Sequence, residues 1–398
     1  MSYINDNGAT IKINDEQQDA FGRIRVSEPH TIFDAKFTYG TEEGLYFTSI
    51  SGSGSATFLP DESAWLLSVG TAAGDKVVRE TYRSFLYLPG KSHSITQTGV
   101  LGAPKANVRQ QIGYFDDSDG VYFEQEIDSI CIVLSASVTG SVQKSRIIQA
   151  NWNRDKLDGS GPSGITIDPS KAQIFVIDFQ WLGVGRVRYG FNIAGKNVYC
   201  HEINNANNVE TTYMRTAQLP LRYVIENTGI TASATSMRQI CSTVVSEGGY
   251  NLSGPSFSFY SGDTPISLPV STNTIVASFR MRPVVGGHSN RSVAQFLAMD
   301  IIPSADRPLH YSFIINPTLT GDNFQPSGFA SSVVDIDVSA TSYTGGESRF
   351  SGLLTDRMGL KDIAGGIELI PGVVFLIVLR PMVTPMSAWL TMNWREVS

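Results

Sequence analysis

The sequence predicts an all-β protein built as antiparallel β-sandwiches of jelly-roll type, in two packed β domains with few short helices. Many short runs alternate apolar and polar residues, which is the period of a half-buried strand. The composition combines 41% hydrophobic residues with 37 Gly and 18 Pro, as is typical of a turn-rich β protein. Gly or Pro interrupts the windows that would otherwise hold a helical period, and Leu353–Ala364 is the best helix candidate.

The stretch Lys171–Asn208 predicts a three-strand antiparallel meander in the middle of a sandwich core. Phe175, Ile177, Phe179 and Trp181 alternate along its first strand. A Leu-Gly-Val-Gly turn follows, and the next strand places Val187, Tyr189, Phe191 and Ile193 on one face. A second turn at Ala194-Gly195-Lys196 leads into the third strand, Val198–Ile203.

The 398 residues exceed one small domain, and three segments are expected. Residues 1–30 form an extended N-terminal arm, 31–250 a β-sandwich domain, and 251–398 a second β-sandwich domain. The Gly-, Ser- and Pro-rich stretch Glu247–Pro269 motivates the boundary, although a long connection between two sheets fits it nearly as well. Further strands are expected at Ile32–Tyr39, Leu45–Ile50, Ala64–Val69, Val77–Leu88, Asn107–Tyr114, Ile130–Ser137, Ser145–Trp152, Arg238–Val245, Thr274–Arg282, Ser292–Ile302, Leu309–Asn316, Val333–Val338, Val373–Leu379 and Ala388–Arg395.

The charge and the apolar runs argue against two classes of partner. The net charge is −7, so no general attraction to nucleic acid is expected. The most apolar run, Val373–Leu379, is too short to span a membrane. The N-terminus lacks the basic and apolar regions of a signal peptide. Cys131, Cys200 and Cys241 lie far apart in strand-like runs, which predicts small core residues rather than disulfides or a zinc site.

No cofactor is expected, because the two phosphate-loop likenesses fail. Gly183 and Gly185 are followed by Arg188 where a dinucleotide motif needs a third glycine. Pro89-Gly90-Lys91-Ser92 lacks the glycine that a phosphate-binding loop needs five residues before Gly90.

The weak metal candidate is calcium, held by Asp117 and Asp119 in the segment Tyr114–Glu124. The plainer alternative is that Asp119-Gly120 makes a hairpin turn and that the other carboxylates are solvated.

No catalytic constellation stands out, and the chain is expected not to be an enzyme. Cys200 and His201 are adjacent, but neighbouring strand residues point to opposite faces, so a core cysteine and a surface histidine are expected. The carboxylates Asp168, Asp178, Glu202 and Glu210 offer no spacing that singles out glycosidic chemistry. Two arginine pairs share strand faces, and cross-strand carboxylates explain them more simply than a nucleic acid or an acidic glycan does; the pairs are Arg186 with Arg188 and Arg280 with Arg282.

Five stretches resemble virion structural proteins of tailed bacteriophages, many of which infect marine or freshwater bacteria. The resemblance covers residues 19–230 strongly and the C-terminal part, ending in Leu390–Val397 (LTMNWREV), more loosely. The stretches are Asp19–Pro29 (DAFGRIRVSEP), Arg83–Ser92 (RSFLYLPGKS), Gly99–Phe115 (GVLGAPKANVRQQIGYF), Gln149–Pro169 (QANWNRDKLDGSGPSGITIDP) and Asp178–Asn208, which contains WLGVGRVRYG.

The resemblance implies a component of the virion that is made in the host cytoplasm, and it brings no catalytic residues. We expect a homo-oligomer, a trimer, on the outside of the particle, as a capsid decoration or spike or as a tail-associated fibre or adaptor. Its partners would be copies of itself and other virion proteins of the capsid or tail. The alternative is a carbohydrate-binding adhesin at a tail tip or spike, with a host surface glycan as partner. The attachment element is expected in the arm, at Phe21, Arg23, Ile24, Arg25 and Val26.

Overall fold

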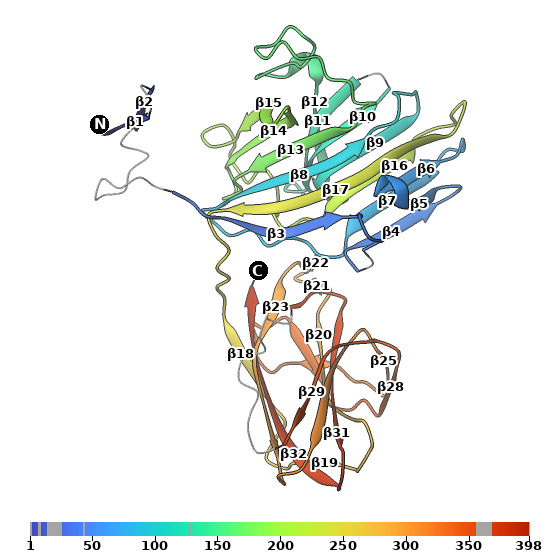
Figure 1. Cartoon of the computed structure of the whole chain (residues 1–398), viewed down its shortest axis with the longest axis vertical. Helices are drawn as coiled ribbons and strands as arrows, with labels where there is room; N and C mark the ends of the chain where they lie inside the picture. Colours follow the sequence, from blue (N-terminus) through green and yellow to red (C-terminus); the bar gives the residue numbers. More distant parts are fainter. Residues whose placement is uncertain are drawn as a thin grey trace. The chain divides into compact units, whose positions relative to one another are not determined.

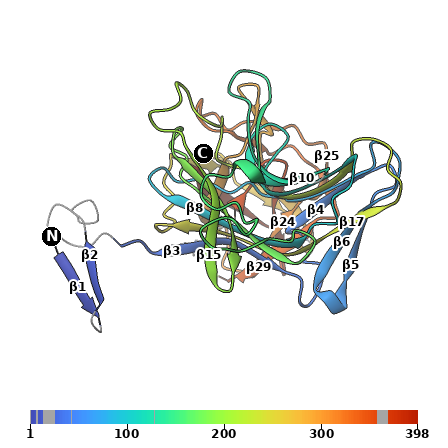
Figure 2. The same cartoon turned by 90° about the horizontal axis from the view of Figure 1, so that it is seen from above.

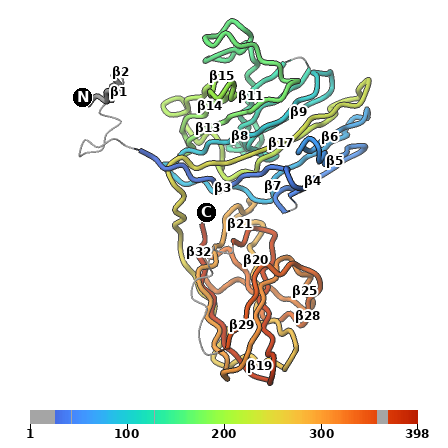
Figure 3. Tube along the Cα trace, viewed as in Figure 1, coloured from blue at the N-terminus to red at the C-terminus, as the bar shows by residue number. Residues whose placement is uncertain are grey.

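The chain divides into two units, residues 1–251 and 252–398, and each is an antiparallel β structure (Figure 1). The structure, a computed structural model, describes residues 2–6, 9–13, 26–42, 44–127, 129–355 and 368–397. Unit 1 runs from blue to yellow along the trace and unit 2 from yellow to red (Figure 3). Within the described residues the only helical segments are two three-residue turns, η2 (Pro60–Glu62) and η3 (Gln149–Asn151). Across that same part of the chain, a helix with the length and hydrophobicity to cross a bilayer is not found.

Unit 1 is a sandwich of two large sheets, which confirms the predicted fold class. The first sheet has seven strands in the order β12 (Gln143–Ile148), β11 (Ser129–Ala136), β10 (Gly120–Glu126), β9 (Val108–Phe115), β16 (Leu221–Asn227), β7 (Lys76–Thr81) and β4 (Tyr46–Ser51). The second has eight: β15 (Lys196–Asn204), β14 (Arg186–Ile193), β13 (Gln173–Phe179), β8 (Ser92–Val100), β17 (Thr235–Glu247), β6 (Ala64–Val69) and β5 (Ser55–Leu59), with β3 (Pro29–Lys36) also paired to β17.

The core of unit 1 lies between the two sheets, where aromatic side chains from both sheets meet. Phe123 of the seven-stranded sheet contacts the rings of Phe175, Tyr189 and Phe191 of the eight-stranded sheet, with centroids 5.0–5.7 Å apart. All four side chains are buried, and the alternation in the sequence predicted this for Phe175, Tyr189 and Phe191. Burial of such large rings is the main source of stability for a sandwich of this kind.

The predicted meander exists as β13, β14 and β15, but its expected place in the middle of the sandwich is wrong. These strands form one end of the eight-stranded sheet, and β15 is its outermost strand. Figures 1 and 2 both show β15 and β5 at opposite ends of unit 1. The middle of the sheet is taken by β8 and β17, because β8 pairs with both β13 and β17. An edge position leaves one side of the β15 backbone without a strand beside it.

Unit 2 is a smaller sandwich whose core includes Phe279, Phe296, Phe375 and Trp394. Its five-stranded sheet contains β18 (Ser256–Tyr260), β32 (Met386–Val397), β23 (Val293–Pro303) and β30 (Glu368–Leu369), with β19 (Ile266–Leu268) paired to β32. Its six-stranded sheet contains β26 (Gln325–Pro326), β27 (Val334–Asp337), β20 (Thr274–Met281), β31 (Val374–Pro381), β24 (Leu309–Ile315) and β29 (Glu347–Leu354). The small pairs are β1 (Ser2–Asp6) with β2 (Ala9–Ile13) at the N-terminus, and β21 (Val284–Val285) with β22 (His288–Ser289) and β25 (Thr318–Thr320) with β28 (Ser342–Thr344) in unit 2.

Two local expectations need correction or restriction. The predicted helix Leu353–Ala364 is wrong at its start, because Leu353 and Leu354 end strand β29, and 356–364 lie outside the described residues. In the predicted N-terminal arm, residues 2–6 and 9–13 pair as the strands β1 and β2, and residues 14–25 lie outside the described residues.

Candidate functional site

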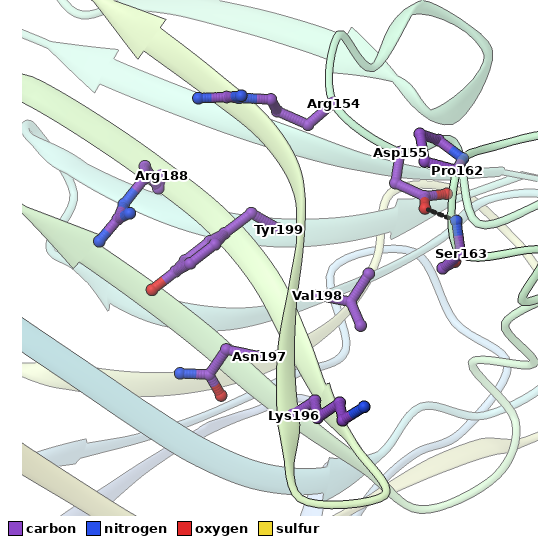
Figure 4. A pocket seen from close by; sticks show the side chains of 9 residues that line it. All are labelled: Arg154, Asp155, Pro162, Ser163, Arg188, Lys196, Asn197, Val198 and Tyr199. Carbon is purple, nitrogen blue, oxygen red and sulfur yellow. Dashed lines mark hydrogen bonds between the residues drawn. The ribbon is translucent and has the colours of Figure 1, made fainter. Parts of the chain in front are cut away.

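A pocket of about 580 Å³ opens at the outer end of the eight-stranded sheet of unit 1, beside β15. A volume of this size is in the range of small-ligand sites. We call it the Tyr199 pocket, and Figure 4 shows the side chains that line it: Arg154, Asp155, Pro162, Ser163, Arg188, Lys196, Asn197, Val198 and Tyr199. In that view Tyr199 and Asn197 project from one side of β15, while Val198 and Lys196 project toward the segment that carries Asp155 and Ser163.

The strand that forms the pocket is shaped by a tight turn and a bulge. Ala194 and Gly195 both have positive φ, which is the conformation of a two-residue hairpin between β14 and β15. The pairing register then shifts between Tyr189 and Gly190, so that Cys200 is an extra residue in β15. At the shift the two backbones come so close that a Cβ on Gly190 would lie 2.6 Å from the carbonyl oxygen of Val198. Glycine at position 190 therefore sets the path of β15 past the pocket.

Three side chains on β13, β14 and β15 hold one another rigidly at the pocket wall. Arg188 donates two hydrogen bonds of 2.6 Å to the carboxylate of Asp178, its direct cross-strand neighbour. The Tyr199 hydroxyl donates to the same carboxylate, and the Arg188 guanidinium lies 4.2 Å from the centre of the Tyr199 ring. Burial and the hydrogen bond to Asp178 raise the pKa of Tyr199 to about 12, so the phenol stays protonated. The ring is thus fixed in position before any ligand arrives.

The segment after β12 forms the opposite wall, and its own carboxylate holds its shape. Asp155 accepts hydrogen bonds from the backbone N–H groups of Leu157 and Ser163, at 2.9 and 2.8 Å. Although burial opposes it, these two bonds lower the pKa of Asp155, and the carboxylate stays ionised. Residues 155–169 are rich in Gly, Ser and Pro, and these hydrogen bonds show how such a stretch becomes an ordered wall.

The same segment covers the free edge of β15 at Cys200 and Glu202. The backbone N–H groups of Arg154 and Asp155 both donate to the carbonyl oxygen of Cys200. The Asn153 side chain forms hydrogen bonds with the backbone of Glu202, and Arg154 forms a 2.5 Å ion pair with the Glu202 carboxylate. Within the described residues, this segment makes no backbone hydrogen bond to residues 196–199, so that part of the edge is open.

The hairpin before the open edge contributes polar groups that face solvent. Lys196 and Asn197 are exposed, and Lys196 has no ion-pair partner within the described residues. Asn192 donates to Oδ1 of Asn197 at 2.7 Å, which leaves the Asn197 Nδ2 group free to donate. The pocket therefore offers mainly hydrogen-bond donors beside one fixed aromatic ring.

The two calcium candidates have separate partners. Asp117 is exposed and forms a 2.6 Å ion pair with Arg222. Asp119 is fully buried, and its oxygens accept from the backbone and hydroxyl of Ser137 and from the backbone N–H of Arg215. Strand β9 ends at Phe115 and β10 begins at Gly120, so residues 116–119 make the turn of a hairpin, as the alternative expected. Its other part is wrong for Glu124, which is fully buried and ion-paired with Arg146 instead of solvated. Among the residues that the structure describes, no group of three or more potential ligands converges on a metal position.

Of the five predicted attachment residues, the structure describes Val26 alone. Phe21, Arg23, Ile24 and Arg25 lie outside the described residues. Val26 is described and is 88% exposed, an uncommon state for a valine.

The prediction of a surface histidine at position 201 is wrong, and the reason is the bulge in β15. His201 is only 6% exposed, and its Nδ1 atom accepts a hydrogen bond from the backbone N–H of Asn153. Cys200 is fully buried and its thiol donates to the carbonyl oxygen of Tyr189. Strict alternation fails where one residue of a strand faces two of its partner. Burial lowers the pKa of His201 and raises that of Cys200, so neither favours a thiolate–imidazolium pair.

Cross-strand carboxylates pair with the predicted arginines, as expected. Arg188 pairs with Asp178, and Arg186 lies 4.0 Å from Glu202. In unit 2, Arg280 and Arg282 share Asp335, at 3.3 and 3.4 Å.

A second charged cluster covers the outer face of the seven-stranded sheet. Glu124 and Glu126 lie two residues apart on β10, and each forms ion pairs with both Arg109 and Arg146, over 2.9–3.8 Å. We call these four residues the Glu124 quartet. Glu124 is fully buried, and the neighbouring Tyr122 is buried with its ring stacked on Phe115. Each carboxylate is therefore bracketed by the same two guanidinium groups.

Sequence reasoning found Asp178, Arg186 and Arg188 but missed Arg154, Lys196, Asn197 and Tyr199 as a group. One signal was available, because Asn197 and Tyr199 are two residues apart in the predicted third strand and therefore share a strand face. The convergence with Arg154 was not visible in the sequence, since it depends on how an irregular segment of a dozen residues folds back.

Comparison with known proteins gives structural likenesses only. No family model matches the chain, and no curated protein is similar to it in sequence. Three solved structures that it is similar to are a β-glucanase of Bacillus licheniformis (7% identity, TM-score 0.34, 57% of this chain and 100% of the other), a legume lectin-like domain of Entamoeba histolytica (9%, 0.29, 50% and 89%) and the CBM2 module of the evolved Dit of Lactobacillus casei BL23 phage J-1 (7%, 0.33, 57% and 100%). Likenesses at these TM-scores carry no inference about ligand or activity.

Proposed function

We propose that the chain is a structural protein on the exterior of a tailed-phage virion, as a capsid decoration or spike or as a tail-associated fibre or adaptor. It acts through protein–protein contacts. The observation that supports this most is the way in which the charged side chains of unit 1 pair with one another across strands. Lys76, Glu226, Arg109 and Glu126 alternate in sign along neighbouring strands of the seven-stranded sheet, with ion pairs of 3.3–3.8 Å. Such pairing suits a rigid body that makes contacts.

The proposed partners are further copies of the chain, assembled as a trimer, and other proteins of the capsid or tail. The proposal involves neither nucleic acid nor a membrane. The N-terminal residues 1–27 are the proposed attachment element, since they precede the first strand of the sandwich, β3.

The test is incorporation into particles. We expect the full chain to be present in virions purified through a density gradient, as detected by mass spectrometry. A chain that lacks residues 1–27 should remain soluble and folded by circular dichroism but should be absent from particles. Virions without this polypeptide would contradict the proposal, and incorporation of the truncated chain would contradict the role of the N-terminal segment.

The Tyr199 pocket favours a second candidate function, in which the protein is a carbohydrate-binding adhesin. A fixed aromatic ring beside several donors is a suitable surface for a sugar, because the apolar face of a pyranose packs on the ring while its hydroxyl oxygens accept hydrogen bonds. On a glycan array, we expect the wild type to bind and Tyr199→Ala to lose binding. Tyr39→Ala is the control, because Tyr39 is 98% exposed and does not line the pocket. Equal signals from all three proteins would contradict this function.

A further inference from the structure

The charge on the lining of the Tyr199 pocket is positive, although the chain as a whole is acidic with a net charge of −7. Three cationic side chains line it, namely Arg154, Arg188 and Lys196, against the single carboxylate of Asp155. The oxygens of Asp155 accept from backbone N–H groups of its own segment, so this carboxylate is held in the wall. A local excess of positive charge attracts an anionic group.

The three cations are not equivalent. Arg188 is held by Asp178 and Arg154 by Glu202, which neutralises much of their charge and fixes their positions. Lys196 remains exposed, and within the described chain it has no ion pair. It is therefore the group with charge left for a ligand, and two residues of β15, Asn197 and Val198, separate it from Tyr199.

The shape of the open edge favours a compact ligand over a peptide. A peptide that added a strand to β15 would need a run of free backbone groups along the edge. Arg154 and Asp155 already donate to Cys200, and Asn153 already pairs with the backbone of Glu202. Only the short stretch 196–199 remains, which is too little for stable strand pairing.

The hydrogen-bonding character of the pocket selects for acceptors. Asn197 presents an amide donor, because its oxygen already accepts from Asn192. Lys196 and Arg154 are donors only. A ligand that fits these groups carries several acceptor oxygens, one negative charge and an apolar face for the Tyr199 ring.

We propose that the Tyr199 pocket binds uronic acid units of an acidic polysaccharide across the open edge of β15, with one sugar ring against Tyr199 and the carboxylate of a neighbouring unit paired with Lys196, which projects from the other side of the strand. This inference rests on the proposed carbohydrate-binding function and specifies its ligand class. The Arg188–Asp178 pair positions the Tyr199 ring, and Asn197 and Arg154 donate to sugar oxygens.

The test compares an acidic oligosaccharide with its uncharged counterpart. Trigalacturonate and trimannuronate are titrated into the protein by calorimetry, and so are their methyl esters, which keep the sugar and remove the charge. We expect the wild type to bind an acid form about fivefold more tightly than its ester, as a partly exposed ion pair would give. This preference should weaken as salt increases.

Variants separate the possible outcomes. Lys196→Gln should bind acid and ester equally and weakly, Tyr199→Ala should bind neither, and Lys171→Gln, which changes an exposed lysine that does not line the pocket, should behave as wild type. Equal binding of acid and ester by the wild type would overturn the uronate inference while leaving carbohydrate binding intact. Binding of neither form by the wild type, or displacement by a tetraglutamate peptide as effective as the sugar, would overturn both.

Discussion

The two outer faces of unit 1 use similar residues and arrive at opposite results. On the seven-stranded sheet, the Glu124 quartet joins two carboxylates to two arginines beside a buried tyrosine, Tyr122. On the eight-stranded sheet, the one carboxylate of Asp178 holds one arginine and the hydroxyl of Tyr199, which lines an open pocket. The two clusters differ in whether a ligand can reach them. We call the Glu124 quartet the closed cluster, and Asp178, Arg188 and Tyr199 the open cluster. Where charges bracket one another completely, the cluster stabilises the sheet; where a rigid tyrosine is left partly exposed, the cluster can receive a ligand.

The largest effect is expected from the closed cluster. Replacement Glu124→Gln removes the charge that faces both Arg109 and Arg146, and it leaves Arg146 with Glu126, and Arg109 with Glu126 and Glu226. Because Glu124 is fully buried, the loss should be about 3 kcal/mol of unfolding free energy. Urea unfolding followed by tryptophan fluorescence measures it. A loss smaller than that of the open-cluster variant Asp178→Asn would invert the comparison.

The next effect concerns the backbone that shapes the open cluster. Gly190→Val would place a Cβ 2.6 Å from the carbonyl oxygen of Val198, so β14 and β15 must separate. We expect a loss of about 2 kcal/mol together with weaker carbohydrate binding. Gly195→Asn is the matched control: nothing lies within 4 Å of a Cβ there, and asparagine tolerates its positive φ. If Gly190→Val were as stable as the control, the close approach of β14 and β15 at Gly190 would not contribute to stability.

The core between the two sheets contains a buried histidine, His93, that belongs to neither cluster and makes stability depend on pH. His93 is fully buried among Tyr87 and Phe179, and neither ring nitrogen has a hydrogen-bond partner within the described residues. Burial lowers the pKa of His93 from 6.5 to about 4. As the pH falls below 6.5 the unfolded chain takes up a proton that the folded chain refuses, so stability declines until about pH 4.

Between pH 7.5 and 5.5 this histidine should therefore remove ~1.4 kcal/mol of stability. His93→Phe should abolish that part of the slope, while His288→Gln, a change at an exposed site, should keep it. Urea unfolding at several pH values measures the difference, and identical slopes for wild type and His93→Phe would refute it.

The smallest stability effect is expected at the open cluster itself. Asp178→Asn should lower the unfolding free energy by about 1 kcal/mol, because Arg188 and Tyr199 are partly exposed and water can replace the lost contacts. Binding of the acidic oligosaccharide should weaken more than stability does, since the Tyr199 ring loses its anchor. Unchanged binding alongside reduced stability would show that the anchor has no part in recognition.

The sequence was sufficient for the fold class and for most strands, because alternation along an edge or outer strand is easy to recognise. It failed in the centre of the eight-stranded sheet. Strand β8 has the sequence SHSITQTGV, and its inward face carries His93, Ile95 and Gln97, of which one alone is aliphatic. Polar residues that are buried among aromatic rings cannot be recognised by hydrophobic periodicity.

The ion pairs of the candidate site could be predicted from the sequence. The way in which its separate segments come together could not. The cross-strand partnership of Arg188 with a carboxylate follows from strand register. The bulge that buries both Cys200 and His201 is marked in the sequence only by Gly190 inside the preceding strand, and it overturns the simple rule of opposite faces. The wall formed by Arg154 and Asp155 depends on a non-repetitive segment, so its position beside β15 requires the three-dimensional structure.

The central claim is that the open cluster receives a ligand and the closed cluster does not. Calorimetric titration of trigalacturonate or trimannuronate into Tyr199→Ala and Arg146→Gln, side by side with wild type, tests it most directly. We predict that Tyr199→Ala gives no binding heat, whereas Arg146→Gln binds as tightly as wild type. Loss of binding in Arg146→Gln together with normal binding in Tyr199→Ala would contradict the claim.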